Sequence, residues 1–354
     1  MDAPKISVLI PMYNRKHYIA DCVNSALNQT FTDFEIIIRD DGSTDGVFEF
    51  VQKKYSNEIS SGKIKLFRNK KNLGEVLNVS RLLRDATGKY LTVLHCDDMY
   101  VPQTLEILFN AAEKFNADVV HSTNFLTSPN DGVIAEGTHL KKISKDRHNV
   151  KTAEIISADL RERFNEWLNG GTFQDLQYNI FRRQFIIDNK IFFYNLCCES
   201  LLFTLIWILR AKTFVKIPEI IYIQRNAPDS QTNDSNSAIY KFENSIPLRL
   251  ELFRSIDKFI SECDFLKNDA ELCYLAKTKM FMTHENLNNV ENNLRGNTDY
   301  VKLYGTIEDA FRKYFGADAV YLALLFHWAH LMQFNKNQVD SLLQDCLKVL
   351  RRDI

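Results

Sequence analysis

The N-terminal part of the chain alternates between short apolar runs and longer amphipathic stretches. The apolar runs are rich in Val and Ile, as expected for strands buried on both faces of a sheet. The stretches between them have the apolar spacing of helices, and this alternation indicates βαβ units in a parallel sheet. The predicted strands cover residues 6–10, 35–38, 63–67, 90–94 and 118–121, and the predicted helices cover 18–27, 45–55, 75–84 and 101–115.

The regular pattern loosens after about residue 125. We expect residues 125–195 to form mainly long loops, which in proteins often carry function. Residues 240–354 have helical periodicity with almost no strand signal, so a helical domain is predicted there after an α/β domain over residues 1–236. Between the loops and this boundary the pattern predicts an apolar helix at 199–211 and two short strands at 213–215 and 219–223.

The composition is that of a folded protein without a bulk preference for polyanions. The chain has 354 residues, and 44 Lys+Arg balance 45 Asp+Glu for a net charge of −1. This balance argues against nucleic acid as a main partner, and the length favours two domains. The seven cysteines show no CxxC spacing, and neither a signal peptide nor a membrane span is recognised. These features predict a cytoplasmic protein, with contact at the inner face of a membrane left open.

Two pairs of adjacent carboxylates follow predicted strands: Asp40-Asp41 and Asp97-Asp98. Ligands of open parallel sheets bind beyond the carboxyl ends of the strands, where both pairs would lie. Neighbouring carboxylates raise each other's pKa values, so a cation is expected beside Asp97 and Asp98, and Mg²⁺ or Mn²⁺ suits such hard oxygen ligands. The alternatives are that Asp97 caps a helix while Asp98 is solvated, and that Asp40-Asp41 belongs to a turn in which Ser43 or Thr44 caps the next helix.

Several motifs of other enzyme classes are absent from the sequence. No GxGxxG follows the first strand, which argues against a dinucleotide-binding oxidoreductase, and neither a GxSxG elbow nor HExxH occurs. A nucleotidyltransferase would be expected to carry a Gly-rich basic loop after the first strand, where this chain has PMYNR. His95 is interpreted as a packed residue at a strand end rather than as a metal ligand.

Three segments within residues 4–122 carry a resemblance as a set. They read ISVLIPMYNR, SALNQTFTDFEIIIRDDGSTD and NLGEVLNVSRLLRDATGKYLTVLHCDDMYVP. In this order they resemble the inverting GT-A nucleotide-sugar glycosyltransferases of the family-2 type, and a weaker match continues to the strand at 219–223. The resemblance implies an α/β GT-A fold, with a Rossmann-like, mostly parallel central sheet and flanking helices. It also implies a nucleotide-binding half at 1–122 and an acceptor-binding half at 123–236.

The resemblance assigns roles to individual positions of this chain. Asp98 would bind the Mn²⁺ or Mg²⁺ that bridges the donor diphosphate, and Asp97 would face the ribose or sugar. Glu199 matches the catalytic acidic residue, which serves as general base. Where the family often has a metal-contacting His, this chain has Asn226, and the adjacent Arg225 would bind phosphate directly. The nucleotide pocket would be lined by Pro11, Tyr13, Arg15, Asp41, which accepts from the uracil ring, Asn72 and Gly74.

The implied activity is metal-dependent, inverting transfer of a sugar from a nucleotide-sugar, with UDP as the expected nucleotide. The acceptor would be a glycan or lipid-linked glycan of a bacterial capsule, lipopolysaccharide or related polysaccharide. A nucleotidyltransferase and an inactive GT-A fold that binds a glycan or partner are the alternatives. The C-terminal helices would shape the acceptor site, form a homodimer or dock on a membrane; without a dense basic face, dimerisation or packing is favoured over membrane contact.

Overall fold

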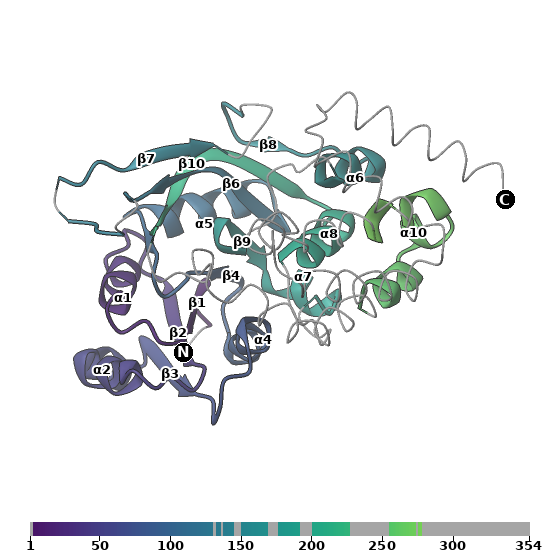
Figure 1. Ribbon diagram of the computed structural model, residues 1–354. Coiled ribbons are helices and arrows are strands. Elements are labelled where there is room, and N and C mark those ends of the chain that lie inside the picture. The colour runs from purple at the N-terminus through teal and green to yellow at the C-terminus, as the bar shows by residue number, and fades with distance from the viewer. Residues whose placement is uncertain are drawn as a thin grey trace, which may run out of the picture. The chain divides into compact units, whose positions relative to one another are not determined.

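A computed structural model (Figure 1) describes residues 3–129, 132–135, 137–144, 150–168, 176–191, 200–226, 255–273 and 275–277. The chain divides into two compact units, Met1–Asp234 with Leu248–Ser255 and Ser235–Pro247 with Ile256–Ile354. The predicted boundary at 236–240 lies outside the described residues and stays a prediction. Within the described ranges, no helix is both long enough and apolar enough to cross a bilayer.

The first unit is built on one sheet, which contains ten strands among the described residues. The strand order is β3-β2-β1-β4-β9-β6-β10-β5, with β7 beside β6 and β8 beside β10. The strands are β1 (Ile6–Met12), β2 (Phe34–Asp40), β3 (Ile64–Arg68), β4 (Tyr90–Val93), β5 (Met99–Tyr100), β6 (Val119–Thr127), β7 (Lys141–Ser144), β8 (Glu154–Ile155), β9 (Asn179–Arg182) and β10 (Phe214–Gln224).

Helices flank this sheet and connect its parallel strands. Helix α4 packs on β1 and β2, and α5 packs on β6, β9 and β10. The helices of this unit are α1 (Ile19–Leu27), α2 (Val47–Lys54), α3 (Ser56–Ser60), α4 (Glu75–Asp85), α5 (Thr104–Lys114), α6 (Leu160–Leu168), α7 (Arg183–Asp188) and α8 (Ser200–Arg210), while α10 (Asp264–Lys267) belongs to the second unit.

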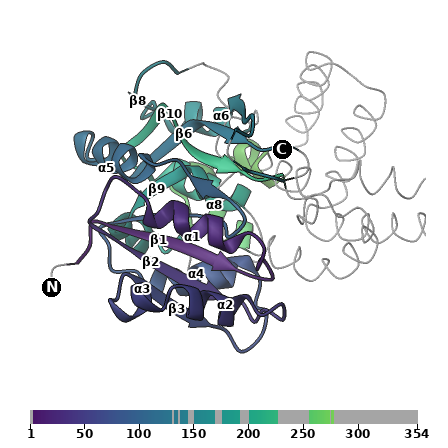
Figure 2. The same cartoon turned by 90° about the vertical axis from the view of Figure 1, so that its left-hand side faces the viewer.

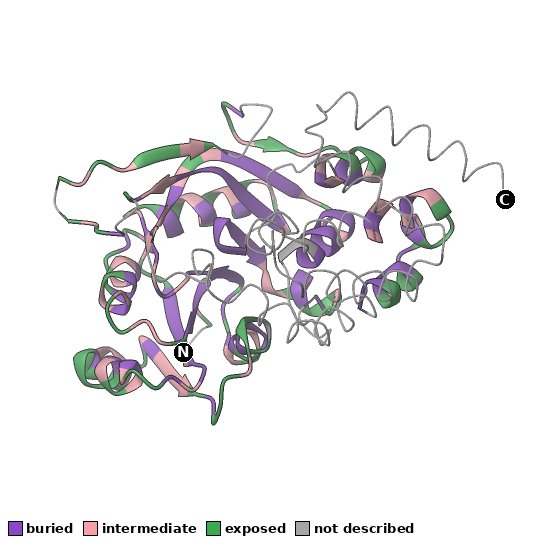
Figure 3. Ribbon diagram, in the orientation of Figure 1, coloured by how far each residue is buried: buried purple, intermediate pink, exposed green. Residues whose placement is uncertain are grey.

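The predicted βαβ half of the sheet is confirmed. Strand β1 pairs in parallel with β2 on one side and β4 on the other, and β2 pairs in parallel with β3. Figure 2 shows β1, β2 and β3 side by side. Every residue of β1 is buried (Figure 3), as its continuous apolar sequence indicates for a strand covered on both faces. The carboxyl ends of β1, β2 and β4 therefore meet at one edge of the sheet.

The sheet becomes mixed beyond β4, where the sequence pattern predicted loops. Strand β9 lies antiparallel between β4 and β6, and β7 and β8 add short antiparallel pairs at the margin. With only four residues, NIFR, β9 is too short to show a periodicity of its own. The same predicted loop region also contains α6 and α7. The prediction of mainly loops over 125–195 is wrong for these described residues.

The last strand of the sheet is longer than predicted. Instead of two strands, residues Phe214–Gln224 form the single strand β10, which runs parallel to β6. Its register shifts between Ile217 and Ile220 and again between Ile220 and Ile223, and Pro218 lies in the first of these irregularities. A proline is tolerated there because the ladder is already interrupted. The continuous strand carries the chain across to the carboxyl end of β4.

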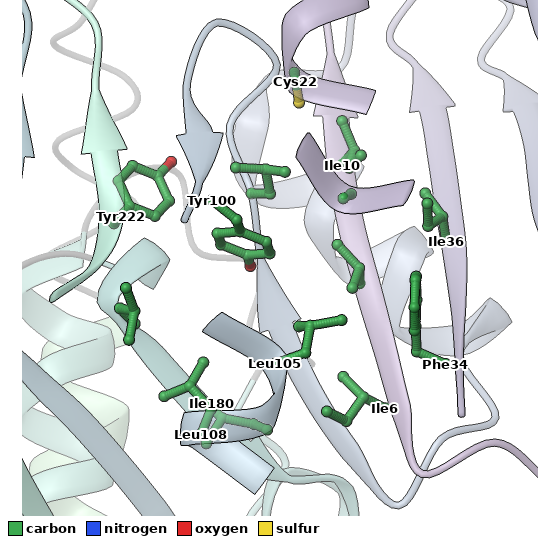
Figure 4. Close-up of a cluster of buried hydrophobic side chains, with 14 of the residues drawn as sticks. Ile6, Ile10, Cys22, Phe34, Ile36, Tyr100, Leu105, Leu108, Ile180 and Tyr222 are labelled. Atoms are coloured by element: carbon green, nitrogen blue, oxygen red, sulfur yellow. The ribbon is translucent and has the colours of Figure 1, made fainter. Parts of the chain in front are cut away.

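One apolar core joins the parallel half to β10. Ile6 and Ile10 of β1 and Leu105 and Leu108 of α5 belong to it, together with Tyr222 of β10 (Figure 4). All five side chains are almost fully buried. Because these residues come from distant parts of the sequence, the core holds the end of β10 in a defined place relative to the loop after β4.

Candidate active site

The loop after β1 and the loop after β2 are joined by hydrogen bonds. Asn14, in the first loop, donates its backbone N–H to Ser43 Oγ at 2.9 Å, and its side-chain Oδ1 accepts from the N–H of Thr44 at 2.9 Å. The backbone of Asn14 has a φ of 49°, a conformation in which asparagine is tolerated better than most residues. These two bonds connect the loops that contain Tyr13 and Asp41.

Asp40 is the buried last residue of β2, and it holds the turn that follows. It accepts from the backbone N–H of Ser43 at 3.1 Å and from Ser43 Oγ, and it pairs with Arg68 Nε at 3.0 Å. Burial raises the pKa of Asp40 above its ordinary value. The turn interpretation of this residue is confirmed. The predicted cap is wrong, because α2 begins after Gly46, whose φ of 79° ends the turn, rather than after Ser43 or Thr44.

Asp41 binds the loop that leads into α4. Its carboxylate accepts from the backbone N–H of Leu73 at 3.0 Å, from that of Gly74 at 2.9 Å and from Asn69 Nδ2 at 2.8 Å. Asn72 Oδ1 accepts from the same Gly74 N–H at 2.8 Å. The structure thus brings together Asp41, Asn72 and Gly74, all predicted for the nucleotide pocket. The predicted uracil contact of Asp41 would have to share its oxygens with this loop.

Asp98 is the more enclosed carboxylate of the Asp97-Asp98 pair. It is 4% exposed, and it accepts from the Tyr222 hydroxyl at 2.8 Å and from the Arg225 backbone N–H at 2.7 Å. Burial, with the neighbouring charge of Asp97, raises the pKa of Asp98 to about 6. The alternative in which Asp98 is merely solvated is therefore wrong. The negative charge of Asp98 is energetically unfavourable in this buried position, and a bound cation would offset that cost.

Asp97 lies at the surface of the same loop. Its side chain is 20% exposed, and Oδ2 is 3.3 Å from Nε of Arg15, which follows β1. The residue does not cap a helix, because the short strand β5 comes next and α5 begins only after Gln103. The structure therefore brings Arg15 and Asp97 together, as expected for neighbours in one pocket. Tyr13, two residues before Arg15 in the sequence, is 36% exposed, whereas Pro11 is buried within β1.

Arg225 lies within reach of the acidic pair, but its guanidinium is already engaged. Nε donates to the backbone carbonyl of Asp97 at 2.8 Å, Nη1 donates to that of Gly132 at 2.7 Å, and Nη2 pairs with Asp21 of α1 at 2.7 Å. The group also lies 4.9 Å from the ring centre of Tyr18. The predicted phosphate contact would require Arg225 to leave these partners, and it stays a prediction.

The donor set at Asp97 and Asp98 suits a hard divalent cation. Among the described residues no group of three or more His, Cys, Asp or Glu side chains could hold a metal. Mg²⁺ and Mn²⁺ need fewer protein ligands than that, because they keep waters and take oxygens from substrate phosphates. Each Asp98 oxygen accepts one protein hydrogen bond and retains acceptor capacity. His95, interpreted as a packed residue, has Nε2 3.4 Å from Glu75 Oε1.

At two positions, Glu199 and Tyr222, the sequence prediction and the described structure do not coincide. Glu199, the predicted base, lies outside the described residues, which resume at Ser200 with helix α8. Tyr222 was not predicted at all, although its hydroxyl contacts Asp98. No motif marks it, and its only signal in the sequence is that it lies near the end of the strand preceding Arg225.

Comparisons with known proteins agree on one family and one fold. The sequence model of Glycosyl transferase family 2 matches residues 7–192. The chain is 30% identical over 181 residues to a chondroitin synthase of Pasteurella multocida (strain Pm70), covering 49% of this chain but only 18% of that protein. It is 28% identical over 230 residues to the putative glycosyltransferase EpsE of Bacillus subtilis (strain 168), covering 55% and 82% respectively.

The crystal structure of S. aureus TarS has a similar fold. It aligns with a TM-score of 0.51 at 18% identity, covering 80% of this chain and 54% of TarS. TarS 1–349 in complex with UDP aligns with a TM-score of 0.50 at 20% identity, covering 78% and 87%. This likeness confirms the predicted GT-A fold, with its mixed curled sheet and flanking helices.

Proposed function

Because the chain belongs to glycosyl transferase family 2, we propose that it transfers a sugar from a UDP-sugar to a glycan hydroxyl with inversion, assisted by Mn²⁺ or Mg²⁺. The observation that carries this proposal is the position of Asp98. It is a buried carboxylate with a raised pKa, beside Asp97, at the carboxyl end of a central strand. A site of this kind favours a cation, and a cation is what a diphosphate leaving group requires.

The residues around Asp98 have complementary roles in the proposal. A metal ion bound by Asp98 would act as a Lewis acid on the diphosphate. Arg15, beside Asp97, adds positive charge at the mouth of the pocket. Pro11, Tyr13 and the loop held by Asp41, with Asn72 and Gly74, line the nucleotide pocket, and Glu199 removes the proton of the attacking hydroxyl.

The comparisons support UDP as the nucleotide and a polysaccharide as the product. Structures of TarS have been solved with UDP and with UDP-GlcNAc, and relatives of this chain include chondroitin synthases. The proposed acceptor is a growing glycan or lipid-linked glycan of a bacterial surface polysaccharide.

The proposal also includes where the protein acts and with what. The described thiols Cys22 and Cys96 are buried and unbridged, which supports a reducing compartment such as the cytoplasm. An acceptor at the inner face of the membrane would be reachable from there. The homodimer predicted through the C-terminal helices stays a prediction, because residues 278–354 lie outside the described residues.

A donor screen tests the proposed function. The thermal stability of the purified chain is measured with a panel of nucleotide-sugars, with and without Mn²⁺, because a ligand that binds only the native state raises it. One UDP-sugar should stabilise the protein in a Mn²⁺-dependent manner and should be turned over. Asp98→Ala should lower kcat/KM by at least about 100-fold, since it removes the proposed metal ligand.

Asp118→Ala is the matched control for the loss of a structural aspartate. Asp118 precedes β6 at the opposite edge of the sheet, where it accepts from the Lys212 backbone N–H at 2.8 Å and pairs with Arg182. This variant should lose stability but retain Mn²⁺-dependent turnover. Full turnover by Asp98→Ala would contradict the metal assignment, and the absence of any stabilising nucleotide-sugar would contradict the donor class.

A further inference from the structure

The end of β10 lies directly against the acidic pair after β4. The Tyr222 hydroxyl accepts from the backbone N–H of His95 at 3.2 Å and donates to Asp98 Oδ2 at 2.8 Å. Because the His95 N–H can only donate and an ionised carboxylate can only accept, the hydroxyl proton is directed at Asp98. The backbone N–H of Arg225 donates to the other oxygen, Oδ1, at 2.7 Å. Together these two bonds fix both the place and the rotation of the Asp98 carboxylate.

The ring of Tyr222 is held so that its hydroxyl has no alternative position. Tyr222 is fully buried, and it meets Tyr100 and Tyr178 edge-on with ring centres 5.8 Å and 5.2 Å away. Tyr100 lies opposite Tyr222 in the antiparallel pair of β5 and β10, and Figure 4 shows the two rings side by side. The donor is thus preorganised by packing.

The other member of the pair is held from the same strand end. The Arg225 guanidinium donates to the Asp97 carbonyl at 2.8 Å and connects it to Asp21 on α1 and to the Gly132 carbonyl. The guanidinium is buried, so water cannot readily take the place of these bonds, and losing one of them costs free energy. Residues 222–225 therefore act on both carboxylate-bearing residues, across sequence separations of 124 and 127 residues to Asp98.

We propose that Tyr222 is a positioning residue, which together with Arg225 orients the Asp98 carboxylate for a divalent cation and so sets the affinity of the site for metal and nucleoside diphosphate. This inference rests on the proposed function, because it assumes that Asp98 binds a metal. Groups that hydrogen-bond to a metal ligand commonly change metal affinity or activity by about 10–100-fold when they are removed.

The experiment compares Tyr222→Phe with Tyr178→Phe. Both changes remove one hydroxyl from the same buried aromatic cluster, but Tyr178 donates to Gln224 Oε1 at 3.0 Å and does not bond to Asp98. Mn²⁺ affinity is measured by electron paramagnetic resonance titration in the presence of UDP. Tyr222→Phe should weaken Mn²⁺ binding about 10-fold, whereas Tyr178→Phe should match the wild type. At saturating Mn²⁺, the Tyr222→Phe variant should recover the turnover of the wild type.

Arg225→Lys is the second variant, and it decides the question if Tyr222→Phe does not fold. Lysine keeps the charge and the backbone N–H that bonds to Asp98, but it cannot bond to three partners in the fork geometry of arginine, so the strand end that carries this N–H is less firmly held. It should also weaken Mn²⁺ binding. Wild-type Mn²⁺ affinity in the folded variants, or a loss of kcat that saturating Mn²⁺ does not restore, would overturn the proposal. A wild-type protein that binds neither Mn²⁺ nor UDP would instead overturn the proposed function itself.

Discussion

The four carboxylates at the ends of β2 and β4 differ in what surrounds them. Asp40 and Asp41 are enclosed by donors from their own turn and from the loop before α4, so they hold the pocket wall together. Asp97 faces Arg15 at the surface, while Asp98 is buried against the end of β10. Two identical residues side by side in the sequence therefore serve different purposes, depending on the donors that reach them.

Gly42, in the loop after β2, lies close to the backbone of the loop before α4, and we predict that it cannot be replaced by alanine without loss. Its φ is 76°, and a Cβ would lie 2.8 Å from the backbone carbon of Lys71. Gly42→Ala should therefore cost about 2–3 kcal/mol, from the positive φ and from displacement of the loop. Because that loop contains Asn72 and Gly74, UDP affinity should fall as well. Urea unfolding and a UDP titration measure the two effects.

Gly62→Ala is the matched control for the backbone conformation. Gly62 has a φ of 78°, but a Cβ there would meet nothing within 4 Å. It should lose only about 1 kcal/mol and keep the UDP affinity of the wild type. Equal losses at the two glycines would show that the close approach to Lys71 does not matter.

At the scale of elements, Glu35 joins three strands of the parallel half. It lies in β2, accepts from Ser7 Oγ of β1 at 2.6 Å and from Thr87 just before β4, and pairs with Lys65 of β3 at 2.6 Å. Burial alone would raise the pKa of Glu35, but the bonds from Lys65, Ser7 and Thr87 outweigh it and lower the pKa. The ionised form is therefore the one that stabilises the sheet.

We predict that the stabilisation by Glu35 depends on pH. A carboxylate with a lowered folded-state pKa contributes stability above its unfolded pKa of about 4.3, and this stability is lost as pH falls through the folded value. Glu35→Gln should therefore be less stable than the wild type by about 1–2 kcal/mol at pH 7. The difference should narrow below about pH 4. Urea unfolding across pH measures it, and a difference that stays constant with pH would contradict the assignment.

The strands also show where element prediction fails. The parallel half was predicted closely because its central strands β1 and β2 are short buried runs rich in Ile, Val and Leu. Strand β9 was missed because its four residues receive their partners, β4 and β6, from elsewhere in the chain. Its insertion matters for the site, since it separates β4 from β6 in the sheet, while β10 still reaches the loop after β4 through β5 and Tyr222.

At the scale of the whole molecule, the charge balance gives an anionic donor no general attraction, so the proposed function relies on a bound cation. The net charge is −1, and the carboxylates of the candidate site make its surroundings locally acidic. A diphosphate with two negative charges would therefore not be attracted over a long range by the net charge of the protein. Binding should therefore come from a short-range metal bridge rather than from the general field of the protein.

This dependence predicts opposite effects of chelator and salt. EDTA should abolish the thermal stabilisation by the UDP-sugar, because the proposed bridge is removed. NaCl at about 0.3 M should leave most of the thermal stabilisation in place, since salt screens mainly exposed charges that lie further apart than the Debye length. Differential scanning fluorimetry with the four combinations measures both. Stabilisation that survives EDTA but disappears in salt would point to direct binding by arginine and lysine.

The sequence by itself determined the elements of the parallel half, the two acidic pairs and their places at strand ends. These follow from local patterns, because apolar runs and turn residues act on their near neighbours. Only the tertiary structure decided that Asp98 is the buried carboxylate of its pair, that Arg225 bonds to the backbone of Asp97, and that Tyr222 bonds to Asp98. These contacts join residues more than a hundred positions apart, and their donors are chosen by the packing of β10 rather than by any pattern along the chain.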